Sequence, residues 1–290
     1  MASGKIDVLA FIGTSKVANL IRSQHPKPNR LRCVLGLEAK NAGIVLKDAD
    51  LSIAVRECVL GSLSYNGQRC TALKILYVHR SVADEFLKMF AAQVRELQLG
   101  MPWENAQITP LPETNKCQYL NELVNDALSK GAKVINEGGG LFNQTIFSPA
   151  VLYPVNESMK VWHEEQFGPV VPIVPFDDIS APISYIENSD FGQQVSVFGT
   201  NPDQIASLVD HLVNQVCRVN VNSQCQRGPD AFPFTGRKDS AEGTLSVSDA
   251  LRAFSIRTLV ATKEDAINKE LLTKITYDHK SNFLSTDYIL

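Results

Sequence analysis

The sequence contains no long apolar run, no paired cysteines and no concentration of charge. Its most apolar stretch, residues 170–176, is interrupted by Pro172 and Pro175 and falls far short of the about 20 residues that span a bilayer. The six cysteines are scattered singly without a Cys-x-x-Cys pair, which is typical of a reducing compartment rather than of a disulfide framework. The N-terminal residues show no secretory signal. We therefore predict a cytoplasmic protein without a membrane span.

Charge is nearly balanced, with 28 lysines and arginines against 31 aspartates and glutamates and a net charge of −3. Because nucleic-acid binding depends on clustered cations, we expect no nucleic-acid partner. The His-Glu-Glu run at residues 163–165 offers metal-ligand side chains, but three adjacent residues rarely converge on one ion, so we predict no metal site. The hydrophobic content of 44% is enough for an ordinary globular core. Neither a Gly-x-Gly-x-x-Gly nor a P-loop sequence is present.

Strand-like and helix-like patterns alternate along the chain, which indicates an α/β fold with a parallel sheet. Buried or half-buried strands are predicted at residues 6–11, 73–79, 170–176 and 195–200. Helices are predicted at residues 50–63, 116–130 and 202–214, and a first helix ends near residue 22. After about Val260 the pattern weakens to a polar helix over residues 263–274 and a tail to residue 290.

Two residues are predicted to mark helix ends. Ser81, with Asp84 three residues later and an apolar stripe after it, is expected to cap a helix that follows the strand at residues 73–79. Gly131 is expected to end the helix at residues 116–130, because glycine readily adopts the left-handed conformation found there.

One cysteine stands out by its position between two predicted elements. Cys70 lies in the sequence Tyr-Asn-Gly-Gln-Arg-Cys-Thr-Ala, residues 65–72, after a long helix and just before a buried strand. α/β proteins place their ligands where chain ends emerge from the sheet. Gly67 permits a tight turn, and the cation of Arg69 beside the thiol favours the reactive thiolate. From these residues alone, Cys70 is equally well interpreted as a nucleophile or as a structural cysteine in a loop.

Five motifs in order link the chain to a known family. Gly-Gln-Arg-Cys at residues 67–70 resembles the active-site motif of the aldehyde dehydrogenase superfamily. Four further stretches resemble that family's cofactor-binding turn, the segment after its catalytic glutamate, and its Glu-Glu-x-Phe-Gly-Pro and Pro-Phe-x-Gly-x-Lys motifs. They fall at residues 11–15, 40–45, 164–169 and 233–238. The resemblance implies an α/β fold with a complete catalytic domain around a parallel sheet and a remnant of a Rossmann-like cofactor domain.

The resemblance also divides the chain. Residues 1–65 would be a partial cofactor-binding domain, residues 66–255 the catalytic domain, and residues 256–290 a C-terminal segment and tail. Family members carry a long N-terminal part with no counterpart in this sequence, including the grip on the adenosine end of the cofactor. Because half of a nucleotide-binding sheet exposes an edge strand and apolar faces, we expect a homo-oligomer or a protein partner.

Within the superfamily, the chain most resembles the non-phosphorylating, NADP-dependent glyceraldehyde-3-phosphate dehydrogenases. In that branch, the arginines matched by Arg69 and Arg227 hold the substrate phosphate, and planar forked donors suit a phosphate dianion. Phe234 is assigned to the same substrate site. The implied substrate is a small phosphorylated aldehyde such as glyceraldehyde 3-phosphate. The alternative is that both arginines are ordinary surface charges.

The resemblance implies a mechanism that uses NADP or NAD. Cys70 would attack the aldehyde carbon, hydride would pass to the cofactor, and a thioester would remain, with the backbone N–H of Cys70 helping to hold the oxyanion. Gly13 and Thr14 would lie against the cofactor. Glu165 would hydrogen-bond its nicotinamide ribose, and Phe167 would pack near the nicotinamide ring.

One catalytic position departs from the family pattern. Counted back from Lys40, the family's Leu-Glu-Leu-Gly-Gly-Lys falls on residues 35–40, so that Gly36 replaces the glutamate that activates water. Glu38 is the candidate replacement, provided that a local shift in register brings it to the site. A missing base slows the step it serves by about 10²–10⁴-fold. Thioester formation would therefore survive while hydrolysis stalls.

Three functions follow from these motifs. The first is an aldehyde dehydrogenase. The second is a catalytically impaired pseudoenzyme that serves as a structural or assembly subunit, which Gly36 favours. The third is a cysteine-dependent esterase or acyl-carrier relic that uses Cys70 without a cofactor. Retention of Arg69, Cys70, Glu165 and Arg227 together favours a catalytic ancestry.

Overall fold

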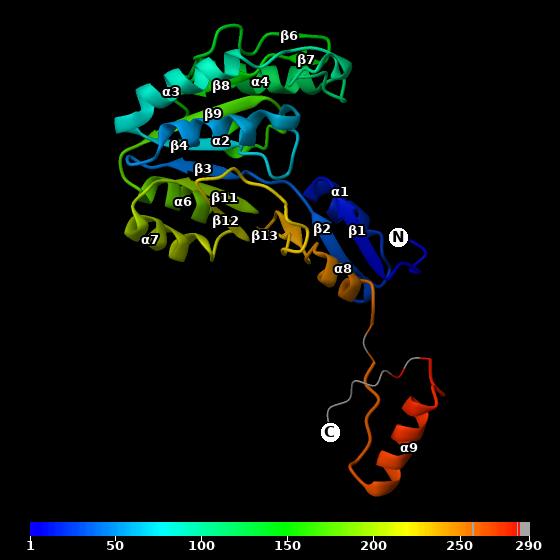
Figure 1. Ribbon diagram of the computed structural model, residues 1–290. Helices are drawn as coiled ribbons and strands as arrows, with labels where there is room; N and C mark the ends of the chain where they lie inside the picture. Colours follow the sequence, from blue (N-terminus) through cyan, green and yellow to red (C-terminus); the bar gives the residue numbers. More distant parts are fainter. Residues whose placement is uncertain (257, 283, 285–290) are drawn as a thin grey trace. The chain divides into compact units, whose positions relative to one another are not determined.

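A computed structural model describes residues 1–256, 258–282 and 284 of the chain (Figure 1). The chain divides into two compact units, Met1–Ala253 and Phe254–Leu290. No helix in these described ranges is both long and apolar enough to cross a bilayer.

The first unit is built on a seven-stranded sheet. Its strands, in spatial order, are β12 (Arg218–Val221), β11 (Gln194–Phe198), β3 (Ala42–Val45), β4 (Ile75–His79), β9 (Val170–Phe176), β8 (Ala150–Tyr153) and β5 (Lys133–Val134). All neighbours run parallel except β5, which is antiparallel to β8. The prediction of an α/β fold with a parallel sheet is therefore confirmed.

Helices cover both faces of this sheet (Figure 1). α2 (Leu51–Leu63) and α3 (Arg80–Arg95) pack on one face; α4 (Lys116–Ser129), α6 (Ser180–Asn188) and α7 (Pro202–Leu212) pack on the other. Alternate residues of β4 enter the two cores: Ile75 and Tyr77 join one, and Leu76 and Val78 join the other. A strand buried on both sides must be apolar at every position, and β4 meets that demand from Ile75 to Val78.

A smaller sheet of three strands lies beside this body, with β1 (Val8–Ile12) at its edge. β1 pairs in parallel with β2 (Arg32–Gly36), and β14 (Ala241–Glu242) pairs antiparallel with the far side of β2. α1 (Ser15–Ser23) connects β1 to β2 by way of a short 3₁₀ helix, Pro28–Arg30. Residues of β1 are only partly buried, in contrast to those of β3 and β4.

The remaining elements are short or peripheral. They are η2 (Ser64–Gly67), η3 (Pro102–Glu104), β6 (Phe142–Asn143), β7 (Ile146–Phe147), α5 (Lys160–His163), β10 (Phe191–Gly192), β13 (Arg237–Lys238), α8 (Val247–Ala253) and α9 (Ala266–Tyr277). α9 belongs to the second unit and buries none of its residues. It overlaps the predicted polar helix at residues 263–274, while residues 283 and 285–290 of the predicted tail lie outside the described residues.

One predicted helix cap is wrong and another is confirmed. α3 begins at Arg80, and its N-cap is His79, whose ring Nδ1 accepts a hydrogen bond of 3.2 Å from the backbone N–H of Ser81. A histidine nitrogen thus takes the place expected for the Ser81 hydroxyl. Gly131 follows α4 with φ of +100°, as expected of a glycine that ends a helix.

Candidate active site

A strained corner precedes Cys70. Tyr65 and Asn66 have φ of 53° and 59°, and Gly67 has φ of 68°, so three consecutive residues are left-handed. Left-handed backbone costs about 1–3 kcal/mol at a non-glycine residue and persists only where the surroundings fix it. Asn66 is fixed by Thr109, whose backbone N–H donates to Asn66 Oδ1 at 2.9 Å and whose hydroxyl accepts from Asn66 Nδ2 at 3.1 Å.

Gly67 is required at this corner for space as well as for φ. A Cβ there would lie 2.7 Å from the carbonyl oxygens of both Ser62 and Gly168. The backbone of two other segments therefore leaves no room for a side chain in the turn that leads into Cys70.

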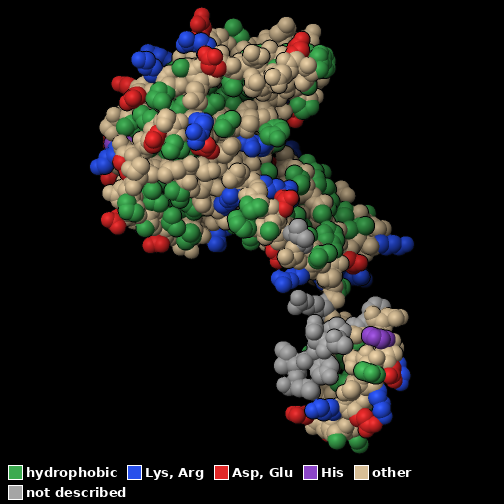
Figure 2. Space-filling model, in the orientation of Figure 1, with side chains coloured by type: hydrophobic (Ala, Val, Ile, Leu, Met, Phe, Trp, Pro, Cys, Tyr) green, Lys and Arg blue, Asp and Glu red, His purple; other side chains and the backbone are tan. Residues whose placement is uncertain are grey.

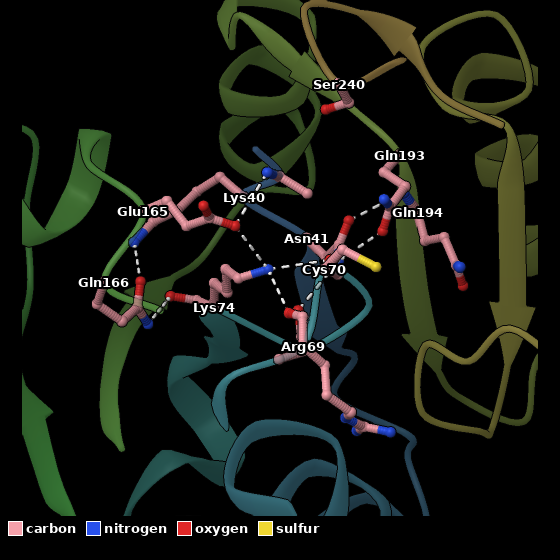
Figure 3. A network of polar contacts seen from close by, with 12 residues as sticks. Lys40, Asn41, Arg69, Cys70, Lys74, Glu165, Gln166, Gln193, Gln194 and Ser240 are labelled. Carbon is pink, nitrogen blue, oxygen red and sulfur yellow. Dashed lines mark hydrogen bonds and ion pairs between the residues drawn. The ribbon is translucent and has the colours of Figure 1, made fainter. Parts of the chain in front are cut away.

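Two side chains hold the carbonyl group of Cys70. Asn41 Nδ2 donates to it at 2.8 Å, and Lys74 Nζ donates to it at 3.0 Å (Figure 3). Asn41 also donates to the carbonyl of Ala72 and accepts from the backbone N–H of Gln194, which ties the loop to β11. Among the described residues, the backbone N–H of Cys70 has no acceptor, so it is available to an oxyanion.

Lys74 joins the Cys70 loop to Glu165. Its ammonium lies 3.0 Å from Glu165 Oε1, and its side chain is only 1% exposed. Glu165 Oε1 also accepts the backbone N–H of Ala39 at 3.0 Å. Both contacts use one carboxylate oxygen, and no described residue bonds to Oε2. Glu165, whose side chain is 13% exposed, therefore has a free acceptor for a ligand hydroxyl.

A second buried lysine holds the backbone around Glu165. Lys40 Nζ donates to the carbonyl of Glu164 at 2.7 Å and to Gln166 Oε1 at 2.6 Å. Burial lowers the pKa of Lys40 well below its usual value, and the neighbouring cation of Lys74 lowers it further. Gln166 in turn donates to the carbonyls of Lys74 and Val170. These contacts give the Glu165 segment a fixed backbone.

Cys70 lies at the amino ends of the parallel strands, because it precedes β4 and Asn41 directly precedes β3. Most α/β proteins bind ligands beyond the carboxyl ends. The general rule invoked for Cys70 therefore does not describe this site, since the nucleophile loop lies at the opposite edge of the sheet.

Arg69 points away from the Cys70 thiol (Figure 3). Its guanidinium faces the carbonyls of Leu60 and Gly61 at 3.5 and 3.4 Å and Gln224 Oε1 at 3.3 Å. It thus interacts with the C-terminal end of α2, where a cation is favoured by the helix dipole. Burial lowers the pKa of Arg69 below its usual value, although a guanidinium remains charged at neutral pH.

Arg227 and Phe234 lie together on a more exposed loop. The guanidinium carbon of Arg227 lies 5.2 Å from the centre of the Phe234 ring. Nε of Arg227 lies 3.8 Å from Oδ1 of Asp230. Gln224, which Arg69 contacts, is three residues from Arg227. The two predicted phosphate ligands thus border one loop, but Arg227 is 57% exposed while Arg69 is half-buried.

Glu38 is bound to the start of α1. Its Oε2 accepts from the backbone N–H of Ser15 at 2.7 Å and from the Ser15 hydroxyl at 2.5 Å. Gly36 ends β2, and a Cβ placed there would meet only Ile12 Cγ1, at an ordinary 3.6 Å. The position of the family base therefore has room for a side chain, while the candidate replacement is engaged elsewhere.

The predicted cofactor residues fall on two elements. Thr14 is the N-cap of α1, with its hydroxyl accepting from the N–H of Val17 at 3.3 Å, and Gly13 precedes it. Phe167 has φ of 42°, and its ring centre lies 5.9 Å from the ammonium groups of both Lys74 and Lys116. The ring of Phe167 is partly exposed and lies two residues after Glu165.

Within the described part of the chain, no three His, Cys, Asp or Glu side chains gather as a metal site requires. Cys225 is fully buried, and its sulfur lies 3.3 Å from the hydroxyl of Ser196. Burial raises the pKa of Cys225 to about 11. It is therefore a packed, neutral thiol rather than a second nucleophile.

The sequence reasoning did not identify Lys74, Asn41 or Gln166 as parts of the site. A signal existed for Lys74, because a lysine in the apolar run Leu-Lys-Ile-Leu at residues 73–76 has to find a buried partner. Asn41 carried no such signal, because its contacts depend on which strands become neighbours.

Comparison with known proteins shows a family match and close similarity to several enzymes. Residues 1–260 match the aldehyde dehydrogenase family. The chain is 37% identical over 226 residues to the NADP-dependent glyceraldehyde-3-phosphate dehydrogenase of Streptococcus equinus, covering 77% of this chain and 46% of that protein. It is also 37% identical over 232 residues to the enzyme of the same name from Arabidopsis thaliana, covering 80% and 45%.

Solved structures agree with these relatives. The NADP-dependent glyceraldehyde-3-phosphate dehydrogenase of Bacillus halodurans C-125, complexed with NADP, superposes with a TM-score of 0.81 at 35% identity over 86% of this chain and 51% of that one. The glyceraldehyde-3-phosphate dehydrogenase of Methanocaldococcus jannaschii, also complexed with NADP, gives a TM-score of 0.82 at 28% identity over 89% and 55%. The chain spans about half the length of the relatives that it matches.

Proposed function

The chain belongs to the aldehyde dehydrogenase family, and on that premise we propose that it oxidises a small phosphorylated aldehyde through a thioester on Cys70, with NADP as the cofactor. The observation that carries this proposal is the geometry at Cys70. Its carbonyl is held by Asn41 and Lys74, while its N–H has no acceptor among the described residues. A loop built in this way fixes a nucleophile beside a donor for an oxyanion.

The chemistry follows from the thiolate of Cys70. Its sulfur forms a bond to the aldehyde carbon, and the π electron pair of the carbonyl moves to oxygen, where the Cys70 N–H stabilises the negative charge. When this electron pair re-forms the carbonyl, the carbon loses its hydrogen as hydride. A bound NADP would supply the hydride acceptor. The product on the protein is a thioester, which water cleaves to a carboxylate.

Glu165 and Phe167 would hold the nicotinamide end of the cofactor. The free Oε2 of Glu165 would accept a ribose hydroxyl, because its other oxygen is occupied by Lys74 and Ala39. Phe167 would pack against the nicotinamide, and Gly13 and Thr14 would border the cofactor at the start of α1.

Arg69 and Arg227 would bind the substrate phosphate. Arg69 is held by carbonyls of α2 and by Gln224, whereas 57% of the Arg227 side chain is exposed and accessible to a ligand. Phe234 beneath Arg227 would form the apolar wall of the substrate site. The names of the relatives support glyceraldehyde 3-phosphate as the aldehyde.

Hydrolysis of the thioester is the weak step. Gly36 offers no base, and the carboxylate of Glu38 is bonded to Ser15. For Glu38 to act, these bonds would have to be exchanged for one to water. This observation favours a second candidate function. The chain would be an impaired enzyme that forms a thioester and hydrolyses it only slowly, and it would serve as a subunit of an assembly.

The exposed face of the small sheet supports self-association or a protein partner. Several large apolar side chains are exposed there: Ile6, Ile12, Val17 and Leu20, with Ile12 at 75%. Figure 2 shows hydrophobic side chains gathered over this part of the molecule. β1 has a neighbour on one side only in the described sheet, so its other edge can pair with a further strand. A monodisperse monomer by light scattering at micromolar concentration would contradict this.

A single-turnover assay tests the proposed reaction. The chain is mixed with glyceraldehyde 3-phosphate and NADP, and the absorbance of reduced nicotinamide is followed, with Cys70→Ser as the control. We expect a burst in the wild type, slow turnover afterwards, and no burst in Cys70→Ser. A burst of equal size in the control, or no burst together with no NADP binding by calorimetry, would overturn the proposal for this chain.

A further inference from the structure

Lys74 has contacts on both sides of the site. Its ammonium nitrogen lies 2.9 Å from the carbonyl oxygen of Arg69, 3.0 Å from that of Cys70, and 3.0 Å from Oε1 of Glu165. The first two of these contacts are hydrogen bonds to backbone carbonyls, and the third is an ion pair with a carboxylate. With 1% of the side chain exposed, water does not compete for these bonds.

The other buried side chains of the site divide between its two halves. Lys40 contacts the carbonyl of Glu164 and the side chain of Gln166, on the Glu165 side. Asn41 contacts the carbonyls of Cys70 and Ala72 and the N–H of Gln194, on the nucleophile side. Among the described residues, Lys74 is the side chain that donates hydrogen bonds to the Cys70 loop and also forms an ion pair with the Glu165 carboxylate (Figure 3).

We propose that Lys74 is a positioning residue that couples the backbone of Cys70 to the carboxylate of Glu165, so that a change at Glu165 alters the reactivity of Cys70. The inference rests on the proposed function, because Glu165 is the carboxylate assigned to the cofactor ribose. A ligand hydroxyl on Glu165 Oε2 draws charge from the carboxylate that Lys74 shares. The ion pair between Lys74 and Glu165 is then weaker, and the Lys74 ammonium is held less firmly beside the carbonyls of Arg69 and Cys70.

The contact on the Glu165 side is the one that a substitution can weaken without removing the lysine. Glu165→Gln keeps the shape of the side chain and an oxygen for Lys74 and Ala39, but it removes the negative charge. A charge-assisted bond is about twice as strong as a neutral one. The Lys74 ammonium is then held mainly by two backbone carbonyls, and the Cys70 loop relaxes.

The experiment measures the rate at which iodoacetamide alkylates Cys70 in the full chain, by mass spectrometry of the peptide that contains this residue. The proteins compared are the wild type, Lys74→Met, Glu165→Gln and the double variant. Alkylation needs neither cofactor nor aldehyde, so the result stands even if the chain fails to oxidise an aldehyde. Circular dichroism confirms that each variant is folded.

The matched control is Lys130→Met. Lys130 also bridges a backbone carbonyl, that of Ser158, and a carboxylate, that of Asp126, but it lies at the end of α4. Its removal is expected to leave the alkylation rate of Cys70 unchanged. A general effect of losing a lysine bridge would instead appear in this variant too.

We expect Lys74→Met and Glu165→Gln each to slow the alkylation of Cys70, the former by about tenfold, and we expect the double variant to match Lys74→Met. A lysine with a merely structural role would give effects that add. The proposal is overturned if folded Lys74→Met reacts like the wild type, or if Glu165→Gln has its full effect in the Lys74→Met background. If Lys74→Met does not fold, Glu165→Gln alone decides, and an unchanged rate in it overturns the coupling.

Discussion

The two sheets of the first unit contribute unequally to the candidate active site. The seven-stranded sheet supplies the nucleophile loop, whose polar groups are bonded by buried side chains such as Asn41 and Lys74. The three-stranded sheet supplies the place for the base, where Gly36 has no side chain and Glu38 is bonded to Ser15. The half of the site that would form the proposed thioester is therefore preorganised, and the half that would hydrolyse it is not.

The largest effect is expected where the incomplete half is restored. Gly36→Glu returns a carboxylate to the end of β2, and a Cβ there meets only Ile12 at 3.6 Å. A positioned general base accelerates its step by about 10²–10⁴-fold, so we expect the deacylation rate to rise by about 10²-fold or more. The measurement is the steady-state hydrolysis of p-nitrophenyl acetate after the acylation burst of Cys70.

Gly36→Gln is the control for this substitution, because it has the same shape and cannot accept a proton. If the deacylation rate rises in both variants, the effect comes from a change in the backbone rather than from a base. If the deacylation rate does not rise in Gly36→Glu, the position of the attacking water, rather than the absence of a base, limits hydrolysis.

The next effect should come from breaking the ordered half. Gly67→Ala places a methyl group 2.7 Å from two backbone carbonyls at a residue with φ of +68°. We expect a loss of about 3 kcal/mol or more in the free energy of unfolding by urea, since strain and overlap both contribute. Gly138→Ala is the matched variant, because it has φ of +67° with no atom within 4 Å, and it should lose only about 1 kcal/mol.

The ordered half should also lose stability at alkaline pH. Burial raises the pKa of Cys225 from 9.0 to about 11, so its contribution to stability is complete below the unfolded value and is lost as the pH rises toward the folded one. Two pH units at about 1.4 kcal/mol each give a loss of roughly 2–3 kcal/mol between pH 9 and 11. Urea denaturation across this range should show a shallower decline in Cys225→Ala.

Cys33 in β2 provides the comparison from the less ordered sheet. Burial raises its pKa too, but this thiol is partly exposed. Cys33→Ala should change the alkaline decline less than Cys225→Ala does. Equal changes in the two variants would remove the distinction between the sheets.

The smallest effect is expected at the start of α1. Ser15→Ala removes the hydroxyl that donates to Glu38 and leaves the backbone N–H bond in place. A single partly exposed hydrogen bond is worth about 1 kcal/mol, so the thermal midpoint should fall by only a few degrees. Ser23→Ala, at the other end of the helix, controls for the loss of a serine. A loss several times larger would mean that the Glu38 contact holds the small sheet together.

The sequence predicted elements well where local pattern decides them. The strand at residues 170–176 was predicted with its observed bounds, because an apolar run of seven residues is followed by charged residues. The N-cap of α3 was predicted wrongly, because a serine and a histidine there both have an atom that can accept a hydrogen bond. In the structure, the His79 ring accepts from the backbone N–H of Ser81. The motifs identified Cys70 and Arg69 as candidate site residues, but they do not show the direction in which the Arg69 side chain points.

The rest of the site depends on strand register, which no local pattern contains. Val195 of β11 pairs with Ala42 of β3, and Ala42 pairs with Ile75 of β4. This register brings Asn41, Lys74 and Gln194 side by side at one edge, although 153 positions separate the first from the last. Only the assembled sheet shows that Lys74 and Asn41 share the carbonyl of Cys70.

The position of Cys70 at the amino ends of the strands has a consequence for how selectivity can change. The helices that lead into this edge arrive with their C-terminal carbonyls, as α2 does beside Arg69. Along the seven-stranded sheet, the helix that follows a parallel strand starts at the other end of that strand, so its backbone N–H groups, which bind anions in many nucleotide-binding proteins, lie away from Cys70. Recognition of the proposed anionic substrate would therefore depend on the side chains of individual cations. Single substitutions at such positions would then change which class of substrate is accepted without any change in the scaffold.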